Sequence, residues 1–352
     1  MPRRPARKRS GILMPAAVLL LCAALLLISH RMGGDAHVDA LLDAIAKNQT
    51  FIASSIALET GIPTPELAPT VPVQKSVEPT QNASEPTMES ALPPDMESLP
   101  EVLPPAQDKR DTNIEIRNDA DISVDVASML ENPIEIHVKQ DQTPQVLIYH
   151  THATEAYTPS GKDTYKPSGD YRTRDKNQSV VRVGTELAKV LKARGIGVVH
   201  ITDIFDDPAY NGSYGRSLAA AEQALKKYPD IKVTIDLHRD AILTKDGQQL
   251  RLGSTIGGQE VAQLMLVVGT NASGLEHPHW RKNMNFAVNL QADANGAYPG
   301  LMRDVNLRSQ RFNTHLRSGS LLLECGSSGN TLQEALRSIR MFGEVLADRL
   351  LA

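Results

Sequence analysis

Imidazole and carboxylate side chains follow three apolar segments that lie far apart in the sequence. The segments are VLIYHTHATE, which begins at residue 146, TIDLHRD, which begins at residue 234, and LLLECG, which begins at residue 321. Their imidazole and carboxylate residues are His150, His152 and Glu155 in the first, Asp236, His238 and Asp240 in the second, and Glu324 in the third. Such groups bind divalent metal ions or transfer protons.

Three of these residues form the kind of ligand set that catalytic zinc requires. Such sites use three nitrogen or oxygen ligands from the protein and leave the fourth position to water. The H-x-x-E spacing of His152 and Glu155 allows one turn to present both side chains to the same ion. His238 completes the set from the end of another strand. The sequence therefore predicts His152, Glu155 and His238 as zinc ligands.

Three neighbouring residues have plainer interpretations. Strand alternation puts His150 on the same face as His152, so His150 stays open as an alternative ligand. Asp236 is expected to orient a ligand imidazole rather than to bind the metal. Cys325 is expected to lie in the core, because no activating base stands beside it. It is also too distant from Cys22 for the two cysteines to form a thiolate zinc site.

Glu324 is the carboxylate that the sequence assigns to proton transfer. A bound zinc ion lowers the pKa of its water from 15.7 to about 7 and polarises the carbonyl under attack. A nearby carboxylate takes the proton from that water and passes it to the leaving nitrogen. Glu324 follows SLLL at the end of a buried strand, where a carboxylate is costly without a partner or a purpose. A salt bridge to a nearby arginine is the alternative interpretation.

The elements that carry these residues alternate between apolar strands and amphipathic helices. Strands are expected over 146–150, 196–201, 232–238, 263–269, 302–307 and 320–325, and helices over 178–193, 215–227, 279–294 and 331–350. IEIRN, ISVDV and IEIHV, all before residue 139, are also typical of short strands. The alternation predicts an α/β fold with a mostly parallel central sheet and helices on both faces. Sites in such folds lie beyond the carboxyl ends of the strands.

The first sixty residues are typical of a membrane anchor. Residues 1–10 contain five Lys or Arg and no acidic residue, and residues 11–29 form an uncharged apolar run. A helix of that length nearly crosses a hydrocarbon core of about 30 Å, and the basic tail is expected to stay in the cytoplasm. A cleaved signal peptide is the alternative, although no small-x-small cleavage site follows the run. Residues 30–60 are expected to form a juxtamembrane segment with helical periodicity.

A linker and one globular domain make up the remainder of the chain. Residues 61–110 hold eleven of the 22 prolines among Glu, Ser and Thr, a composition typical of an extended spacer. Residues 111–352 are expected to form one extracytoplasmic domain. The net charge of 37 − 41 = −4, without a basic stripe, argues against a nucleic-acid partner. The sequence thus predicts a single-pass protein of the cell membrane.

Four segments, in this order along the chain, resemble the stage II sporulation protein P family: VLIYHTHATEAY, TIDLHRDA, YPGLMRDVNLRSQRFNTHL and GSLLLECGSSGNTLQEALRS. The resemblance runs through most of residues 112–350. It implies a relation to the zinc amidases that cleave the bond between N-acetylmuramic acid and L-alanine in bacterial peptidoglycan. It also implies a role in engulfment during sporulation, beside a partner lytic transglycosylase and a scaffold in the forespore membrane.

The resemblance also implies roles for single residues. By position, His152 and His238 match zinc ligands and Glu324 matches the catalytic glutamate. The glutamate ligand of the wider amidase superfamily usually stands further downstream, where this chain has Asp175, so Asp175 is kept as the alternative to Glu155. Side chains expected to pair with stem-peptide carboxylates or otherwise to contact substrate are Arg239, Arg303, Arg308, Arg311, Asn313 and His315.

The sequence therefore predicts a membrane-anchored zinc amidase with one Zn²⁺ per chain and peptidoglycan as its substrate. Three other functions stay open. One is a zinc endopeptidase that cuts within the stem peptides, alone or in addition to the amidase activity. Another is a non-catalytic wall-binding or scaffold module on the same fold. The third is a tethered structural spacer, which leaves the histidines and the carboxylate at the strand ends without explanation.

Overall fold

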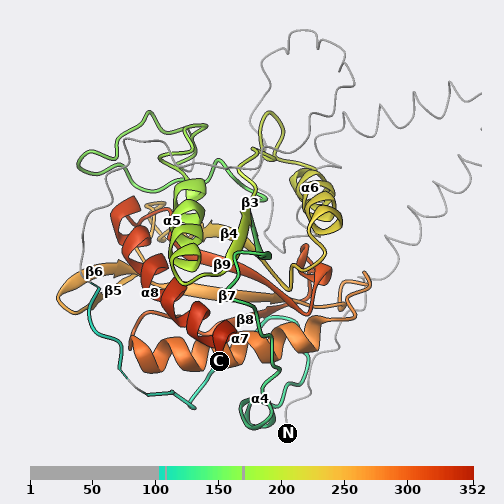
Figure 1. Cartoon of the computed structure of the whole chain (residues 1–352). Helices are drawn as coiled ribbons and strands as arrows, with labels where there is room; N and C mark the ends of the chain where they lie inside the picture. Colours follow the sequence, from blue (N-terminus) through green and yellow to red (C-terminus); the bar gives the residue numbers. More distant parts are fainter. Residues whose placement is uncertain (1–102, 108, 169–170) are drawn as a thin grey trace, which may run out of the picture. The chain divides into compact units, whose positions relative to one another are not determined.

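The computed structural model describes residues 103–107, 109–168 and 171–352 (Figure 1). The predicted cytoplasmic tail (1–10), anchor (11–29), juxtamembrane segment (30–60) and most of the linker (61–110) lie outside the described residues. Within the described part of the chain, no helix combines the length and the apolarity needed to cross a membrane.

A seven-stranded sheet forms the centre of the domain, in the order β1-β8-β7-β9-β4-β2-β3. Its strands are β1 (Ile116–Asn118), β2 (Pro144–Tyr149), β3 (Gly197–His200), β4 (Val233–Asp240), β7 (Leu264–Gly269), β8 (Val305–Arg308) and β9 (Gly319–Ser327). All neighbours are parallel except β7 and β9, which are antiparallel. The sheet is therefore mixed, and the prediction of a mostly parallel sheet is confirmed.

The antiparallel pair divides the sheet into two groups of opposite direction. Leu264, the first residue of β7, is in register with Cys325 near the end of β9. β8 runs with β7, so the residues that precede β7 and β8 lie at the edge where β2, β4 and β9 end. The residues that follow β7 and β8 leave the sheet from the opposite edge.

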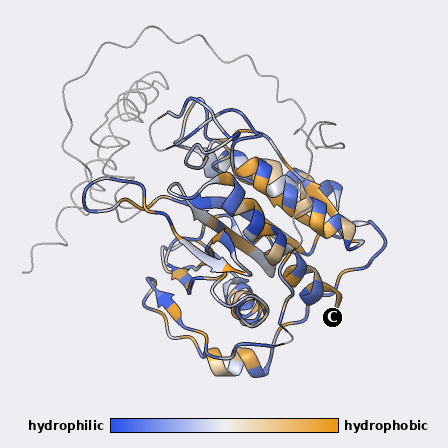
Figure 2. Ribbon diagram, turned by 90° about the vertical axis from the view of Figure 1, so that its left-hand side faces the viewer, coloured by the Kyte–Doolittle hydropathy of each residue, from blue (hydrophilic) through white to orange (hydrophobic). Residues whose placement is uncertain are grey.

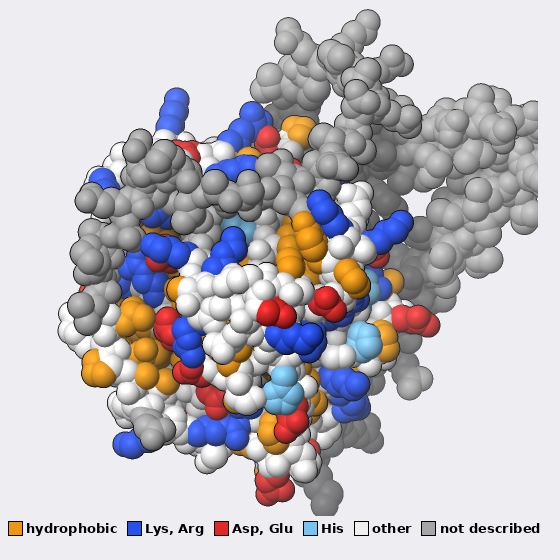
Figure 3. Space-filling model, viewed as in Figure 1, with side chains coloured by type: hydrophobic (Ala, Val, Ile, Leu, Met, Phe, Trp, Pro, Cys, Tyr) orange, Lys and Arg blue, Asp and Glu red, His pale blue; other side chains and the backbone are white. Residues whose placement is uncertain are grey.

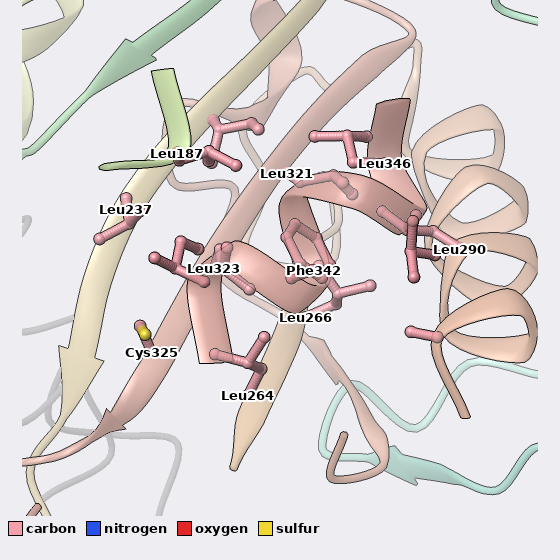
Figure 4. Packing of buried hydrophobic residues seen from close by; sticks show 14 of the residues in the cluster. Leu187, Leu237, Leu264, Leu266, Leu290, Leu321, Leu323, Cys325, Phe342 and Leu346 are labelled. Carbon is pink, nitrogen blue, oxygen red and sulfur yellow. The ribbon is translucent and has the colours of Figure 1, made fainter. Parts of the chain in front are cut away.

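Helices cover the two faces of the sheet unequally. One face packs against α5 (Val180–Ala193), α7 (Trp280–Ala297) and α8 (Leu332–Leu351), and these elements share the large hydrophobic core (Figure 4). The other face packs against α6 (Ser213–Lys227), which shares a smaller core with β2 and β3. Hydrophobic and hydrophilic residues alternate along the long helices (Figure 2), as expected for helices that cover a sheet on one side only.

Strand alternation sorts the residues of β4 and β9 between these faces. Leu237 of β4 and Leu323 of β9 point into the large core (Figure 4). Asp236, His238 and Glu324 have the opposite parity and therefore lie on the face of α6. The buried strands thus bring their ionisable residues to one side of the sheet.

Local sequence signals explain where the helices begin and end. The hydroxyl of Ser179 accepts from the backbone N–H of Val181 at the start of α5. Thr331 and Glu334 form a reciprocal capping box at the start of α8. Gly195, just after α5, has a φ of 78°, which favours glycine at a helix end.

The first part of the domain differs from the prediction. Of the three short segments expected as strands, only IEIRN contributes one, β1. ISVDV and IEIHV form no strand, and helix α4 (Val126–Glu131), which was not predicted, lies between them. A hairpin of β5 (Gly253–Ile256) and β6 (Gln259–Ala262) was not predicted either. Gly257 and Gly258, both with positive φ, make its turn.

The folded domain begins within the predicted linker. The backbone N–H of Gln107 donates to the carbonyl of Ala297 at 3.0 Å, so this segment lies along α7. A Cβ on Gly296 would stand 2.2 Å from the carbonyl oxygen of Lys109, and the glycine therefore permits this close approach. The predicted boundary at residue 110 lies inside this packed segment.

Candidate metal centre

The three predicted metal ligands converge at the edge where β2 and β4 end. One ligand atom from each of His152, Glu155 and His238 lies within 4.8 Å of the others. The Nδ1 atoms of His152 and His238 stand 3.5 and 3.3 Å from the two carboxylate oxygens of Glu155. All three side chains are buried. Among the described residues, this is the group of His, Cys, Asp or Glu that could hold a metal ion.

A tight turn positions His152 and Glu155, and strand β4 positions His238. The backbone N–H of Glu155 donates to the carbonyl of His152 at 3.0 Å, and this turn brings the two side chains together. Glu155 then forms an antiparallel bridge with Arg172. His238 comes from β4, the parallel neighbour of β2.

Positive and polar groups keep the Glu155 carboxylate ionised. Its Oε2 accepts from the backbone N–H of Arg239 at 3.1 Å, and its Oε1 lies 3.5 Å from Nη2 of Arg172. Burial alone would raise the pKa of Glu155, but hydrogen bonds from His152 and His238 and the nearby cations hold this pKa well below its usual value. Glu155 is therefore a negatively charged ligand candidate.

Asp236 lies behind His238, as the sequence predicted for a residue that orients a ligand imidazole. Asp236 Oδ1 is 2.8 Å from His238 Nε2. Thr151 donates to Asp236 through its backbone N–H at 2.8 Å and through its hydroxyl at 2.6 Å. Burial lowers the pKa of His238, but the charges and hydrogen bonds of Asp236 and Glu155 outweigh it and raise this pKa well above 6.5.

Glu324 stands beside the three residues without joining them. It is in register with His238 on the neighbouring strand. Its Oε2 is buried and has no hydrogen-bond partner among the described residues. Burial, followed by the charge of Asp240, raises the pKa of Glu324 to about 8. A carboxyl group with such a pKa is suited to exchanging a proton near neutral pH.

The two alternative ligands lie elsewhere. His150 faces α5, and its ring nitrogens are 2.8 Å from the carbonyl of Leu237 and 2.9 Å from Nε2 of His200. The alternation argument for His150 and His152 does not apply, because β2 ends at Tyr149. Asp175 is exposed and accepts from the backbone N–H of Asn177 in the turn before α5.

Only one of the four predicted substrate-binding arginines lies at this edge with unused donors. Arg239 is buried, and its Nε donates to the carbonyl of Ala156 at 2.8 Å. Arg308 and Arg311 follow the first residues of β8 and belong to the segment that leaves from the opposite edge. Arg303 precedes β8 and pairs with Asp240 at 3.0 Å, while its Nε and Nη2 have no hydrogen-bond partner among the described residues.

Asn313 and His315 also differ from the substrate-binding roles expected for them. Asn313 is buried, and its Nδ2 donates to Ser217 Oγ and to the carbonyl of Tyr214, both at 3.0 Å. It therefore supports α6. The ring of His315 lies near His277, with the ring centroids 6.3 Å apart, in a separate cluster.

Several residues that complete the centre were not predicted from the sequence. Arg172 pairs with Asp206 at 2.9 Å and reaches Glu155. Tyr210 stacks on His152 with ring centroids 4.4 Å apart, and Tyr214 meets the same imidazole edge-on. All four lie in loops or at the start of α6, where no periodicity marks them. The aromatic pair in PAYNGSY, just after a predicted strand, was the available signal.

The donor set fits a divalent metal. Two imidazoles and one carboxylate are three nitrogen or oxygen ligands of the type found around catalytic zinc. The Asp236 carboxylate behind His238 matches the outer partner that such ligands usually have. The fold and the centre together define a class, an α/β domain with a buried two-histidine, one-glutamate centre at its strand edge.

Comparison with known sequences places the chain within a family. Residues 66–347 match the family described as stage II sporulation protein P. The chain is 30% identical over 214 residues to Stage II sporulation protein P of Bacillus subtilis (strain 168), a match that covers 58% of this chain and 50% of that protein. This chain therefore aligns with about half the length of that relative. The chain belongs to the stage II sporulation protein P family, as its four segments predicted.

Two solved structures show distant similarity in backbone. The N-acetylmuramoyl-L-alanine amidase AmiC2 of Nostoc punctiforme has a TM-score of 0.35 and 15% identity, covering 60% of this chain and 97% of that one. The catalytic domain of the CD27L endolysin targeting Clostridia difficile has a TM-score of 0.36 and 11% identity, covering 59% and 97%.

Proposed function

We propose that this protein is a zinc-dependent peptidoglycan hydrolase that cleaves the amide bond between N-acetylmuramic acid and the L-alanine of the stem peptide. The observation that carries the proposal is the convergence of His152, Glu155 and His238 within 4.8 Å, beside Glu324. Membership of the stage II sporulation protein P family supports the substrate class and a role in sporulation.

Each residue of the candidate metal centre has its own role in the proposed hydrolysis. His152, Glu155 and His238 would hold the metal, which when bound supplies a Lewis acid and an activated water. Asp236 orients His238 through the contact of 2.8 Å at Nε2. Glu324 accepts a proton on its unpartnered Oε2 and returns it to the leaving nitrogen of L-alanine.

The proposal extends to where the enzyme acts. We propose that residues 11–29 anchor the chain in the cell membrane, with the basic tail in the cytoplasm, and that the linker carries the domain to peptidoglycan outside. A lytic transglycosylase and a forespore-membrane scaffold are the proposed partners.

On the face seen in Figure 3, basic and acidic side chains are intermixed.

The test uses purified full-length protein, zinc and isolated peptidoglycan, with mass analysis of the released fragments. An amidase releases stem peptides with a free N-terminal L-alanine, whereas an endopeptidase leaves that L-alanine on muramic acid. Glu324→Gln is expected to retain zinc and to lose hydrolysis. His238→Ala is expected to lose both. Hydrolysis that persists in Glu324→Gln, or in chelated wild-type protein, would contradict the proposal.

A further inference from the structure

A half-exposed aromatic ring lies directly on a metal-ligand candidate. Tyr210, in the loop between β3 and α6, is 51% exposed, yet its ring stacks on the imidazole of His152 with the centroids 4.4 Å apart and an angle of 20° between the planes. The other exposed large hydrophobic residues in the described part of the chain are Leu243 and Leu275. Tyr210 is thus the exposed aromatic residue that borders the metal centre.

The ring of Tyr210 is held in place by a fixed cation. The guanidinium carbon of Arg172 lies 5.1 Å from its ring centroid. Arg172 is itself fixed, since its Nη1 donates to Asp206 Oδ2 at 2.9 Å and to Thr154 Oγ1 at 3.2 Å. An aromatic surface that is already immobile loses little conformational entropy when a ligand packs on it.

Arg303, beside Asp240, has hydrogen-bond donors without a partner among the described residues. Nη1 of Arg303 is engaged by Asp240, which leaves Nε and Nη2 on the other edge of the guanidinium. These two N–H groups form the fork that binds a carboxylate with two parallel hydrogen bonds. Buried donors are nearly always paired, so this edge is one that a bound carboxylate would satisfy.

The order of the strands places these groups in a line along the sheet edge. Tyr210 lies in the loop after β3, His152 and Glu155 follow β2, His238 belongs to β4, and Glu324 belongs to β9. Arg303 precedes β8, and its backbone N–H donates to the carbonyl of Leu264 at the start of β7. An aromatic ring at one end suits the apolar C–H face of a sugar ring. A carboxylate fork at the other end suits an acidic peptide.

We propose that the substrate lies in one direction across this edge, with the muramic acid ring on Tyr210 and a stem-peptide carboxylate on Arg303. This inference rests on the proposed function and deepens it. The sugar ring is separated from the scissile amide by a single lactyl group. A sugar on Tyr210, which touches His152, therefore brings that amide to the metal centre and directs the peptide over Glu324.

The test compares three soluble substrates with full-length protein: a muramoyl peptide, the same peptide with lactoyl in place of muramic acid, and the muramoyl peptide with amidated carboxylates. Tyr210→Ala is expected to lower kcat/KM about tenfold on the muramoyl peptide and to lower it less on the lactoyl peptide. Tyr210→Phe keeps the ring and serves as the matched control. Arg303→Ala is expected to lower kcat/KM about tenfold or more on the free acid and to lower it less on the amidated peptide, and Arg303→Lys is expected to recover part of the loss.

Equal losses on the muramoyl and lactoyl peptides, or a fall in the zinc content of Tyr210→Ala, would overturn the role of Tyr210. An equal loss on free and amidated peptides would overturn that of Arg303. A binding titration separates this inference from the proposed function. Peptide-free glycan should bind Glu324→Gln protein, and more weakly when Tyr210→Ala is added, whether or not the wild type hydrolyses any substrate; unchanged binding overturns the inference.

Discussion

Asp236 Oδ1 lies 2.8 Å from His238 Nε2, while Nδ1 of the same imidazole lies 3.3 Å from Glu155. The two ring nitrogens are therefore divided between an outer carboxylate and the candidate metal centre. Because the two carboxylates flank the ring, the direction of the imidazole is set before any metal arrives.

This arrangement predicts the effect of removing the outer charge. Asp236→Asn is expected to lower zinc affinity about 10–100-fold, because the amide no longer fixes the imidazole as a carboxylate does. A competition titration with a chromophoric chelator measures the affinity. Asp230→Asn, at an exposed position, is the matched control and should bind zinc as the wild type does. Equal affinity in the two variants would remove Asp236 from this role.

Two arginines in one loop should differ sharply in their effect on stability. The side chain of Asp206 is fully buried and pairs with Arg172, so Arg172→Ala leaves an uncompensated buried charge. The expected loss in the free energy of unfolding is about 3 kcal/mol. Arg174 is 73% exposed where it pairs with Asp207, and Arg174→Ala is expected to cost about 1 kcal/mol or less. Urea unfolding of both variants measures the difference, and similar losses would refute this account.

Two helical glycines should respond in opposite directions to alanine. A Cβ on Gly184 of α5 would stand 2.6 Å from the ring of His150, whereas a Cβ on Gly215 of α6 would have no atom within 4 Å. Gly184→Ala is therefore expected to destabilise the fold by about 1–3 kcal/mol through overpacking. Gly215→Ala is expected to stabilise it by up to about 1 kcal/mol, since alanine favours helices. Thermal unfolding checks both signs, and stabilisation by Gly184→Ala would show that His150 moves freely.

Acid should weaken the fold through a histidine far from the metal centre. Burial, followed by the charge of His315, lowers the pKa of His277 to about 4, and its Nε2 lies 2.9 Å from Thr314 Oγ1. A histidine with a lowered pKa binds fewer protons when folded than when unfolded, so stability is lost as pH falls from about 6.5 to about 4. His277→Gln should reduce the difference between urea midpoints at pH 7 and pH 5. An unchanged difference would assign the acid sensitivity to other groups.

The strands and helices of the domain were largely predictable because their signals are local. Apolar runs, the serine and threonine caps and the glycine after α5 mark elements that the structure contains. Strand ends also indicated which residues meet at one edge, since His152, Glu155 and His238 follow or end buried strands. No periodicity marks Tyr210 or Arg172, which reach the centre from loops.

Strand direction is what the sequence could not supply. A buried apolar strand has the same pattern whether it runs with or against its neighbour. Arg308 and Arg311 were expected to contact substrate because they stand in MRDVNLRSQR, just before the strand that carries Glu324. Because β7 and β8 run opposite to β9, the segment with Arg308 and Arg311 leaves the sheet at the opposite edge. Arg303, which precedes β8, lies at the edge of the candidate metal centre.

The reversal of β7 also offers a practical site for labelling. The loop that follows β7 emerges at the far rim of the sheet, and residues 271–276 in it are all exposed. A fluorophore attached there would report on the tumbling of the domain from the edge opposite the candidate metal centre.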